Sequence, residues 1–171
     1  MGGLMSNRLL VLIWFFSMSL KLWAQDSSFT FKENDFVNIS TSTSLQAETG
    51  MTIECWVNPD IETFSDYSPI VHYFRLGGAD QESGFALQYF EDELRFMLSV
   101  GTGAYDIYGD GLQLWPGMAL DQDVWTHVAG TYDVATGQAK IFKNGVEQSS
   151  FNTEGGNINW DFIETVDMKI G

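Results

Sequence analysis

Apolar residues recur at every second position in short runs along this chain, and Gly, Asp, Asn and Ser separate the runs. This spacing is typical of β-strands, whose successive side chains point to opposite faces of a sheet. No run shows the periodicity of a helix longer than one turn. The pattern predicts strands at Phe29–Phe31, Phe36–Ile39, Thr52–Val57, Ile70–Arg75, Phe85–Phe90, Leu94–Val100, Trp125–Tyr132, Ala139–Lys143 and Met168–Ile170.

Turn residues organise these strands into an all-β fold. Asn144 and Gly145 separate two strands, and this pair is favoured in type I′ hairpin turns because both positions need positive φ. Residues 133–137 predict a longer hairpin loop that closes with Gly, so residues 125–148 are expected to form a three-stranded meander. Strands at this spacing indicate two antiparallel sheets packed as a sandwich.

Three residues inside the predicted strands are expected to pack in the core. Trp56 and Trp125 carry large apolar surfaces and fall within strand patterns, so we expect both indoles to be buried. Cys55 is expected to be a small buried side chain and not a reactive thiol. As the only cysteine, it has no partner for an internal disulfide, so the core must hold the fold together.

The first 24 residues have the pattern of a secretory signal peptide. Arg8 provides a basic start, residues 9–16 are continuously apolar, and Ala24 is a small residue at the expected cut. The alternative is a transmembrane anchor, which needs about 20 apolar residues, but Ser and Lys residues interrupt the stretch. We therefore expect residues 25–171 to form one domain that is secreted or displayed at the cell surface, without membrane insertion after signal cleavage.

The chain is strongly acidic, with 8 basic residues against 23 acidic ones and a formal net charge of −15. Such a charge repels nucleic acid phosphates and anionic membrane surfaces, so neither is an expected partner. Divalent cations would be attracted instead.

Taken as a set, the strands resemble the laminin G-like branch of the concanavalin A-like lectin and glucanase superfamily, whose fold is a jelly-roll sandwich. Members continue beyond the strand that ends in Ile-Gly, so the resemblance implies that a chain stopping at Gly171 is incomplete at its C-terminus. The matching blocks are Phe29–Phe31, Asn34–Ile39, Met51–Pro59, Trp125–Asp133, Ile141–Val146 and Met168–Gly171.

The glucanases of this superfamily raise the question of catalysis. Retaining glucanases need two carboxylates about 5 to 5.5 Å apart, usually on one strand face, and no such run occurs here. The nearest acidic cluster is Glu91-Asp92-Glu93, where a solvated turn is the expected structure. His72 and His127 lack a nearby nucleophile signature. We expect no catalytic residues in this chain.

Calcium is the metal that the resemblance implies. Related domains bind it at a sheet rim, and calcium takes 6 to 8 oxygen ligands at about 2.3 to 2.6 Å. Asp80 and Gln81, in the loop before Phe85, correspond to the position of an Asp-Asn pair in pentraxins, and Asp35 is a second candidate ligand. The alternative for Asp80 is an ordinary turn residue.

Aromatic residues in predicted loops suggest sugar binding. Tyr105, Tyr108 and Trp115 lie in the long segment 101–122, where flat rings could stack on sugar faces. Tyr67 and Trp160 also lie in predicted loops and could stack in the same way. The alternative for all of these rings is that they cover the ends of the sandwich.

The sequence thus favours a non-catalytic extracellular recognition module that binds a glycan or an extracellular protein, with calcium as a candidate cofactor. A second interpretation is an accessory domain of a larger secreted polysaccharide-degrading enzyme. A third, a hydrolase within this domain, would have to use Glu91 or Glu93.

Overall fold

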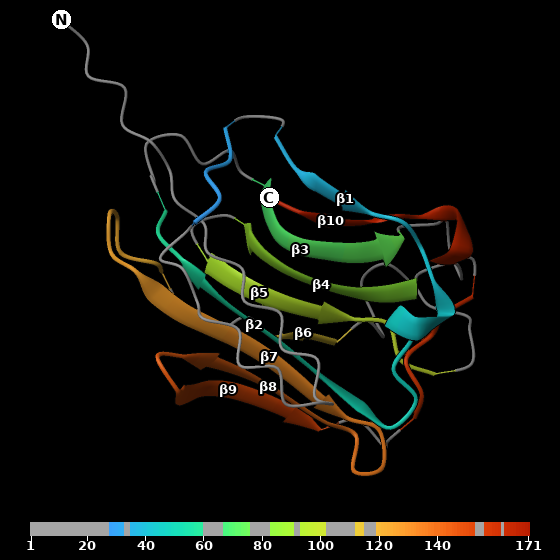
Figure 1. The fold of residues 1–171 in the computed structure, drawn as a ribbon. Coiled ribbons are helices and arrows are strands. Elements are labelled where there is room, and N and C mark those ends of the chain that lie inside the picture. The colour runs from blue at the N-terminus through green and yellow to red at the C-terminus, as the bar shows by residue number, and fades with distance from the viewer. Residues whose placement is uncertain are drawn as a thin grey trace, which may run out of the picture.

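The computed structural model describes residues 28–32, 35–59, 67–75, 83–90, 93–101, 112–114, 119–152, 156–161 and 163–171. Within these residues, ten strands form two antiparallel sheets that pack face to face (Figure 1). The predicted all-β sandwich is therefore confirmed. The predicted signal peptide lies outside the described residues and stays a prediction.

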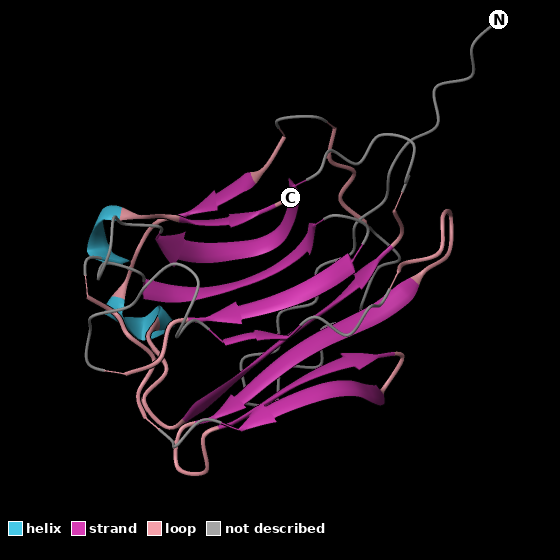
Figure 2. Ribbon diagram, turned by 180° about the vertical axis from the view of Figure 1, so that it is seen from behind, coloured by secondary structure: helices cyan, strands magenta, loops and turns pink. Residues whose placement is uncertain are grey.

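One sheet has six strands and the other has four. The six-stranded sheet has the order β1 (Val37–Ile39), β10 (Met168–Ile170), β3 (Tyr67–Arg75), β4 (Ser83–Phe90), β5 (Glu93–Leu98) and β6 (Leu112–Leu114). The four-stranded sheet has the order β2 (Gly50–Val57), β7 (Thr126–Asp133), β8 (Gln138–Lys143) and β9 (Val146–Asn152). Two single turns of 3-10 helix, Thr43–Leu45 and Ile163–Thr165, lie at the same end of the sandwich (Figure 2).

Most strand predictions are confirmed, with shifts of a few residues at the ends. The segment Phe29–Phe31 is not a strand, since only Phe29 makes a bridge. The ring of Phe31 instead packs so closely on Gly171 that a Cβ there would lie 2.3 Å from Cδ1 of the ring. Conversely, β6 lies inside the segment predicted as a long loop, because a three-residue strand leaves little periodicity to detect.

The meander predicted for residues 125–148 is the hairpin pair β7–β8–β9. Asn144 has φ 51° and Gly145 has φ 76°, as a type I′ turn requires. In the β7–β8 loop, Oδ1 of Asp133 accepts hydrogen bonds from the backbone N–H and the hydroxyl of Thr136 at 2.8 and 2.9 Å. Gly137 closes that loop with φ 69°. Local turn chemistry therefore fixes the register of β7, β8 and β9 within the four-stranded sheet.

The core lies between the two sheets, where Gly130 of β7 packs tightly against Phe96 of β5. Phe96 is fully buried, and a Cβ at position 130 would lie 2.6 Å from Cδ2 of its ring. Real Cβ atoms do not come so close to another heavy atom. A glycine is therefore needed here for the ring to fit between the sheets.

Cys55 of β2 is part of this core, as predicted, with 1% of its surface exposed. Burial raises the pKa of its thiol to about 12, and the neighbouring carboxylate of Glu54 adds to the shift. The thiol is therefore neutral at physiological pH.

We predict that Gly130→Ala lowers the free energy of unfolding by about 1–3 kcal/mol, because the added methyl overpacks the Phe96 ring. Urea denaturation measures this. Thr131→Ala, on the opposite face of the same strand, should change stability by less than about 0.5 kcal/mol. Gly130→Ala combined with Phe96→Leu should cost less than the sum of the two single changes. Additive effects, or an unchanged Gly130→Ala midpoint, would contradict this packing.

Cys55 should not react with a thiol reagent such as Ellman's reagent while the protein is folded, even at mildly alkaline pH. Burial and the raised pKa together remove the nucleophilic thiolate. The absorbance of the released thiolate should appear only after a denaturant is added. Rapid reaction in native buffer would show that β2 opens or that Cys55 is not in the core.

Candidate functional site

Trp56 is a large aromatic side chain on the outer face of the four-stranded sheet. It is 40% exposed, whereas its neighbours Cys55 and Val57 are 1% and 4% exposed. The prediction that Trp56 belongs to the core is therefore wrong. The physical reason is strand alternation: with Cys55 and Val57 directed inward, the residue between them must point outward.

The prediction that Trp125 belongs to the core is also wrong, because this residue is 37% exposed. It comes immediately before β7, in the same odd-numbered series as the outward-facing His127. Val124 beside it is exposed as well. Two exposed indoles are therefore contributed by two paired strands, one by β2 and one by the entry to β7.

His127 and Glu54 are the polar partners of Trp56. Trp56 lies directly opposite His127 in the β2–β7 pairing, with ring centroids 5.4 Å apart and tilted by 57°. The imidazole Nε2 lies 3.5 Å from Oε2 of Glu54, two residues along β2. We call these three residues, Glu54, Trp56 and His127, the Trp56 platform. It combines a flat apolar surface with a carboxylate and an imidazole on one regular sheet face.

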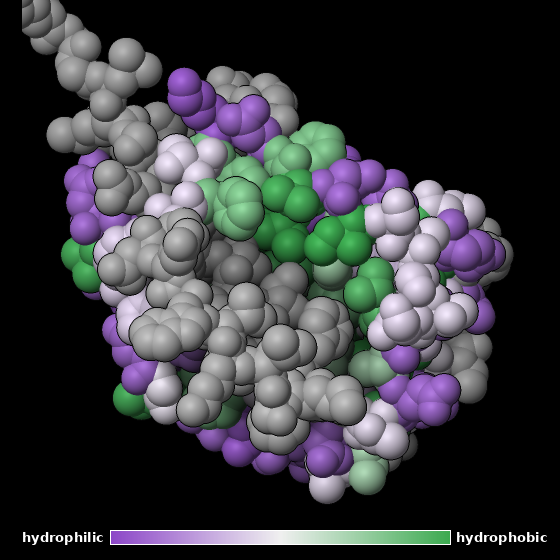
Figure 3. Space-filling model, viewed as in Figure 1, coloured by the Kyte–Doolittle hydropathy of each residue, from purple (hydrophilic) through white to green (hydrophobic). Residues whose placement is uncertain are grey.

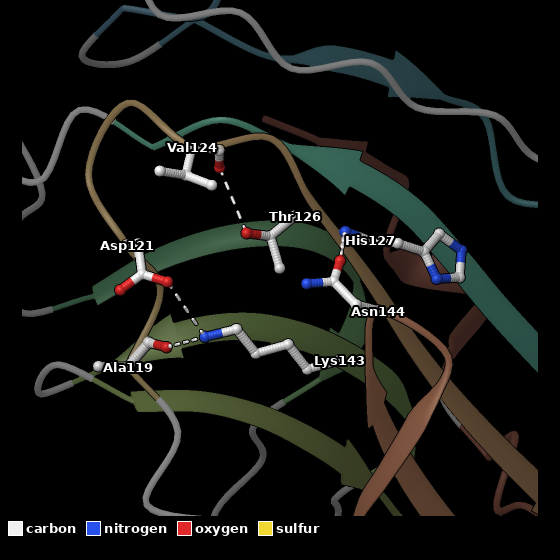
Figure 4. Close-up of polar contacts among 7 residues, drawn as sticks. All are labelled: Ala119, Asp121, Val124, Thr126, His127, Lys143 and Asn144. Carbon is white, nitrogen blue, oxygen red and sulfur yellow. Dashed lines mark hydrogen bonds and ion pairs between the residues drawn. The ribbon is translucent and has the colours of Figure 1, made fainter.

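The end of the sheet next to this platform is held by short polar contacts (Figure 4). The backbone N–H of His127 donates to Oδ1 of Asn144 at 3.0 Å, and the backbone N–H of Asn144 donates to the carbonyl of His127 at 2.8 Å. Nζ of Lys143 donates to the carbonyl of Ala119 at 2.8 Å and lies 3.6 Å from Oδ2 of Asp121. The β8–β9 turn is thus fixed to β7, which carries His127, and the loop before β7 is fixed to β8.

The outer face continues from the platform across β8 and β9. Ala129 of β7 lies between Glu54 of β2 and Phe142 of β8 in the strand register. Although it belongs to the outward-facing series, Ala129 is only 5% exposed, because longer neighbouring side chains cover it. Farther along, Nζ of Lys140 pairs with Oε2 of Glu147 at 2.9 Å. Apolar and charged side chains are therefore interspersed on this face.

A second apolar area lies around β1, on the side of the molecule that Figure 3 shows. Phe29, Phe36 and Val37 are exposed, and the ammonium of Lys169 lies over the Phe36 ring, 4.5 Å from its centroid. The Lys169 ammonium therefore already contacts an aromatic ring of this apolar area. We place the candidate site on the four-stranded sheet, where an exposed indole lies beside a carboxylate and an imidazole.

The sugar-stacking residues predicted from the sequence, Tyr105, Tyr108 and Trp115, lie outside the described residues. Trp160 is described and packs at one end of the sandwich. Its ring centroid lies 6.1 Å from that of Tyr73 and 6.2 Å from that of Phe85, and Nε1 donates to the carbonyl of Ala47 at 3.3 Å. Trp160 therefore covers the end of the core, which is the second of the two roles considered for it.

Two of the predicted calcium ligands, Asp80 and Gln81, also lie outside the described residues. Asp35 closes a small turn: its Oδ2 accepts from the backbone N–H of Lys32 at 3.1 Å, and its own N–H donates to the carbonyl of Lys32 at 2.9 Å. Within the described part of the chain, no group of three or more His, Cys, Asp or Glu side chains is arranged to hold a metal. The calcium site stays a prediction.

Of the residues considered for catalysis, the structure describes Glu93, His72 and His127. Glu93 opens β5 opposite Phe90, while Glu91 and Asp92 lie outside the described residues. His72 belongs to β3, and its ring meets that of Phe74 edge-on at 6.4 Å. Burial lowers the pKa of His72, and the charge of Lys169 lowers it further. This environment favours the neutral imidazole.

Comparison with known proteins agrees with this fold. A laminin G-type family model, described as the concanavalin A-like lectin/glucanases superfamily, matches residues 31–166. No curated protein matches the sequence.

No helix among the described residues is long and apolar enough to cross a membrane.

Two solved structures share the fold. One is a proposed carbohydrate-binding protein from Bacteroides ovatus, with 16% identity and a TM-score of 0.58 over 97% of this chain and 37% of that one. The other comprises domains LG4-5 of the mouse laminin α1 chain, with 16% identity and a TM-score of 0.50 over 80% of this chain and 31% of that one. This chain thus spans about a third of the length of each.

The Asn144 turn allows a test of how the platform is held. Asn144→Gly keeps the positive φ but removes the acceptor for the His127 N–H, so it should cost about 0.5–1.5 kcal/mol in urea denaturation. Asn144→Ala should cost about 1–2 kcal/mol more, because alanine disfavours the left-handed conformation. Equal stability of the Gly and Ala variants would contradict the turn geometry.

Proposed function

Because the chain belongs to the laminin G-like family of the concanavalin A-like superfamily, we propose that it is a non-catalytic recognition module that binds carbohydrate through the Trp56 platform. The observation that supports this most is the exposed indole of Trp56 near the end of a fully paired strand. An indole held on a strand offers a rigid apolar surface, and covering it with a ligand removes that surface from water.

The neighbours of Trp56 suit a sugar ligand. Sugar rings have an apolar face of C–H groups and a rim of hydroxyls, so they need both a flat ring and polar groups beside it. The carboxylate of Glu54 accepts hydrogen bonds, and the imidazole of His127 can donate or accept one. Hydrogen bonds to a charged group contribute about 1.5–3 kcal/mol, so Glu54 would fix the orientation of a sugar stacked on Trp56.

The same arrangement suits binding better than hydrolysis. On the platform, Glu54 faces His127 and not a second carboxylate. A retaining glycosidase needs two carboxyl groups about 5 to 5.5 Å apart, and an inverting one needs them about 6.5–9.5 Å apart. The platform therefore has an acceptor for sugar hydroxyls but lacks the pair of acids that these mechanisms require.

The proposal includes the predicted export by residues 1–24, which would bring the module to polysaccharides outside the cell. A calcium contribution through Asp35, Asp80 and Gln81 is a separate proposal, tested by repeating each binding measurement with EDTA. An accessory domain of a larger polysaccharide-degrading enzyme would use the same platform to hold the substrate.

Trp56→Ala should weaken glycan binding about tenfold or more, equivalent to about 1.4 kcal/mol or more, since it removes the stacking surface. Affinity electrophoresis against soluble polysaccharides identifies a ligand, and calorimetry with its oligosaccharides gives the dissociation constant. Phe151→Ala is the matched control, because it removes another exposed aromatic ring of the same sheet, on β9. Equal binding by Trp56→Ala and the wild type would refute the platform as the site.

A further inference from the structure

We propose that the outer face of the four-stranded sheet selects neutral, chain-like glycans over glycans that carry carboxylate or sulfate groups. This proposal rests on the proposed function and adds the class of ligand. It comes from two features of the face: the state of its charged groups and the spacing of its aromatic residues across the strands.

The charged groups of the face leave no free cation for an anionic sugar within the described residues. Lys140 pairs with Glu147 at 2.9 Å. Lys143, the other lysine of β8, lies opposite the buried Val128 in the inward-facing series, where it donates to the carbonyl of Ala119 and lies beside Asp121. The binding of uronate or sulfate groups in proteins relies on Arg or Lys that can donate to them.

Acidic groups, in contrast, are directed to the ligand side. Glu54 belongs to the platform itself, and Asp133 lies at the far end of β7 on the same face. Hydrogen bonds from Thr136 hold the pKa of Asp133 below its usual range, so this carboxyl is ionised at neutral pH. With a net charge of −15 for the whole chain, an anionic glycan meets repulsion both at the platform and at long range.

The shape of the face favours a chain over a single sugar. Neighbouring strands lie about 4.8 Å apart and each residue adds about 3.4 Å along a strand. Phe142 on β8 is two strands across and two residues along from Trp56 on β2, so their Cα atoms are about 12 Å apart. Ala129, whose side chain is short, lies between their strands. An extended oligosaccharide could stack one ring on Trp56 and contact Phe142 with a ring farther along, which a disaccharide is too short to do.

The experiment compares neutral and acidic oligosaccharides on the full chain by calorimetry. The neutral probes are the hexasaccharides of cellulose, xylan, β-1,3-glucan and β-mannan, each with its disaccharide, and the acidic probes are hexamers of galacturonate and alginate. We expect at least one neutral hexasaccharide to bind about tenfold or more tightly than its disaccharide and than either acidic hexamer. High salt should narrow the gap between neutral and acidic probes, because it screens the repulsion.

Glu147→Gln supplies the matched variant, because it releases the Lys140 ammonium while preserving the size of the side chain. It should raise affinity for the acidic hexamers several-fold and leave the neutral hexasaccharides unchanged. If acidic hexamers bind the wild type as tightly as neutral ones and this binding is lost in Trp56→Ala, the proposed ligand class is wrong. The Trp56 platform would then remain the binding site. If no glycan binds, or if binding does not depend on Trp56, both proposals fail.

Discussion

The antiparallel pairing of β2 with β7 is the constraint from which both the core and the candidate site follow. The register runs from Gly50 opposite Asp133 to Val57 opposite Thr126 without interruption. In this register, one side of each strand faces the opposite sheet and the other faces solvent. A slip of one residue would move Trp56 into the core and Cys55 out of it.

Packing between the sheets makes that register hard to change. The Phe96 ring of β5 fits only against a residue without a Cβ, and Gly130 of β7 provides it. Any shift of β7 by one position would place the side chain of Ala129 or Thr131 against the ring. The same contact that orders the core therefore also fixes which side chains are presented to solvent on the other side of the strand.

The platform is consequently a rigid site. Its three residues lie on strands, and the adjacent hairpin turn is bonded to the His127 backbone through Asn144. Binding sites on regular elements lose little conformational entropy when a ligand arrives. In the proposed function, the acidic surface around the platform would add selectivity, since it would disfavour anionic ligands without requiring a specific contact with them.

Much of this fold could be predicted from the sequence, because the signals were local. Asn144-Gly145 located a hairpin, and the alternation of apolar residues located most strands. The exposed tryptophans were missed because their size suggested burial, although the inward series through Cys55 and Val57 already placed Trp56 outside. The contact of His127 with Trp56 depends on strand pairing between residues 71 positions apart, which no local pattern reveals.

The most direct test is nuclear magnetic resonance of the indole N–H groups during titration with a neutral hexasaccharide, with signals assigned by single Trp→Phe substitutions. The account predicts that the Trp56 signal shifts on binding, while the Trp160 signal, whose N–H donates to the Ala47 carbonyl, stays in place. A ligand that shifts amide signals of the six-stranded sheet and leaves Trp56 unchanged would contradict the account.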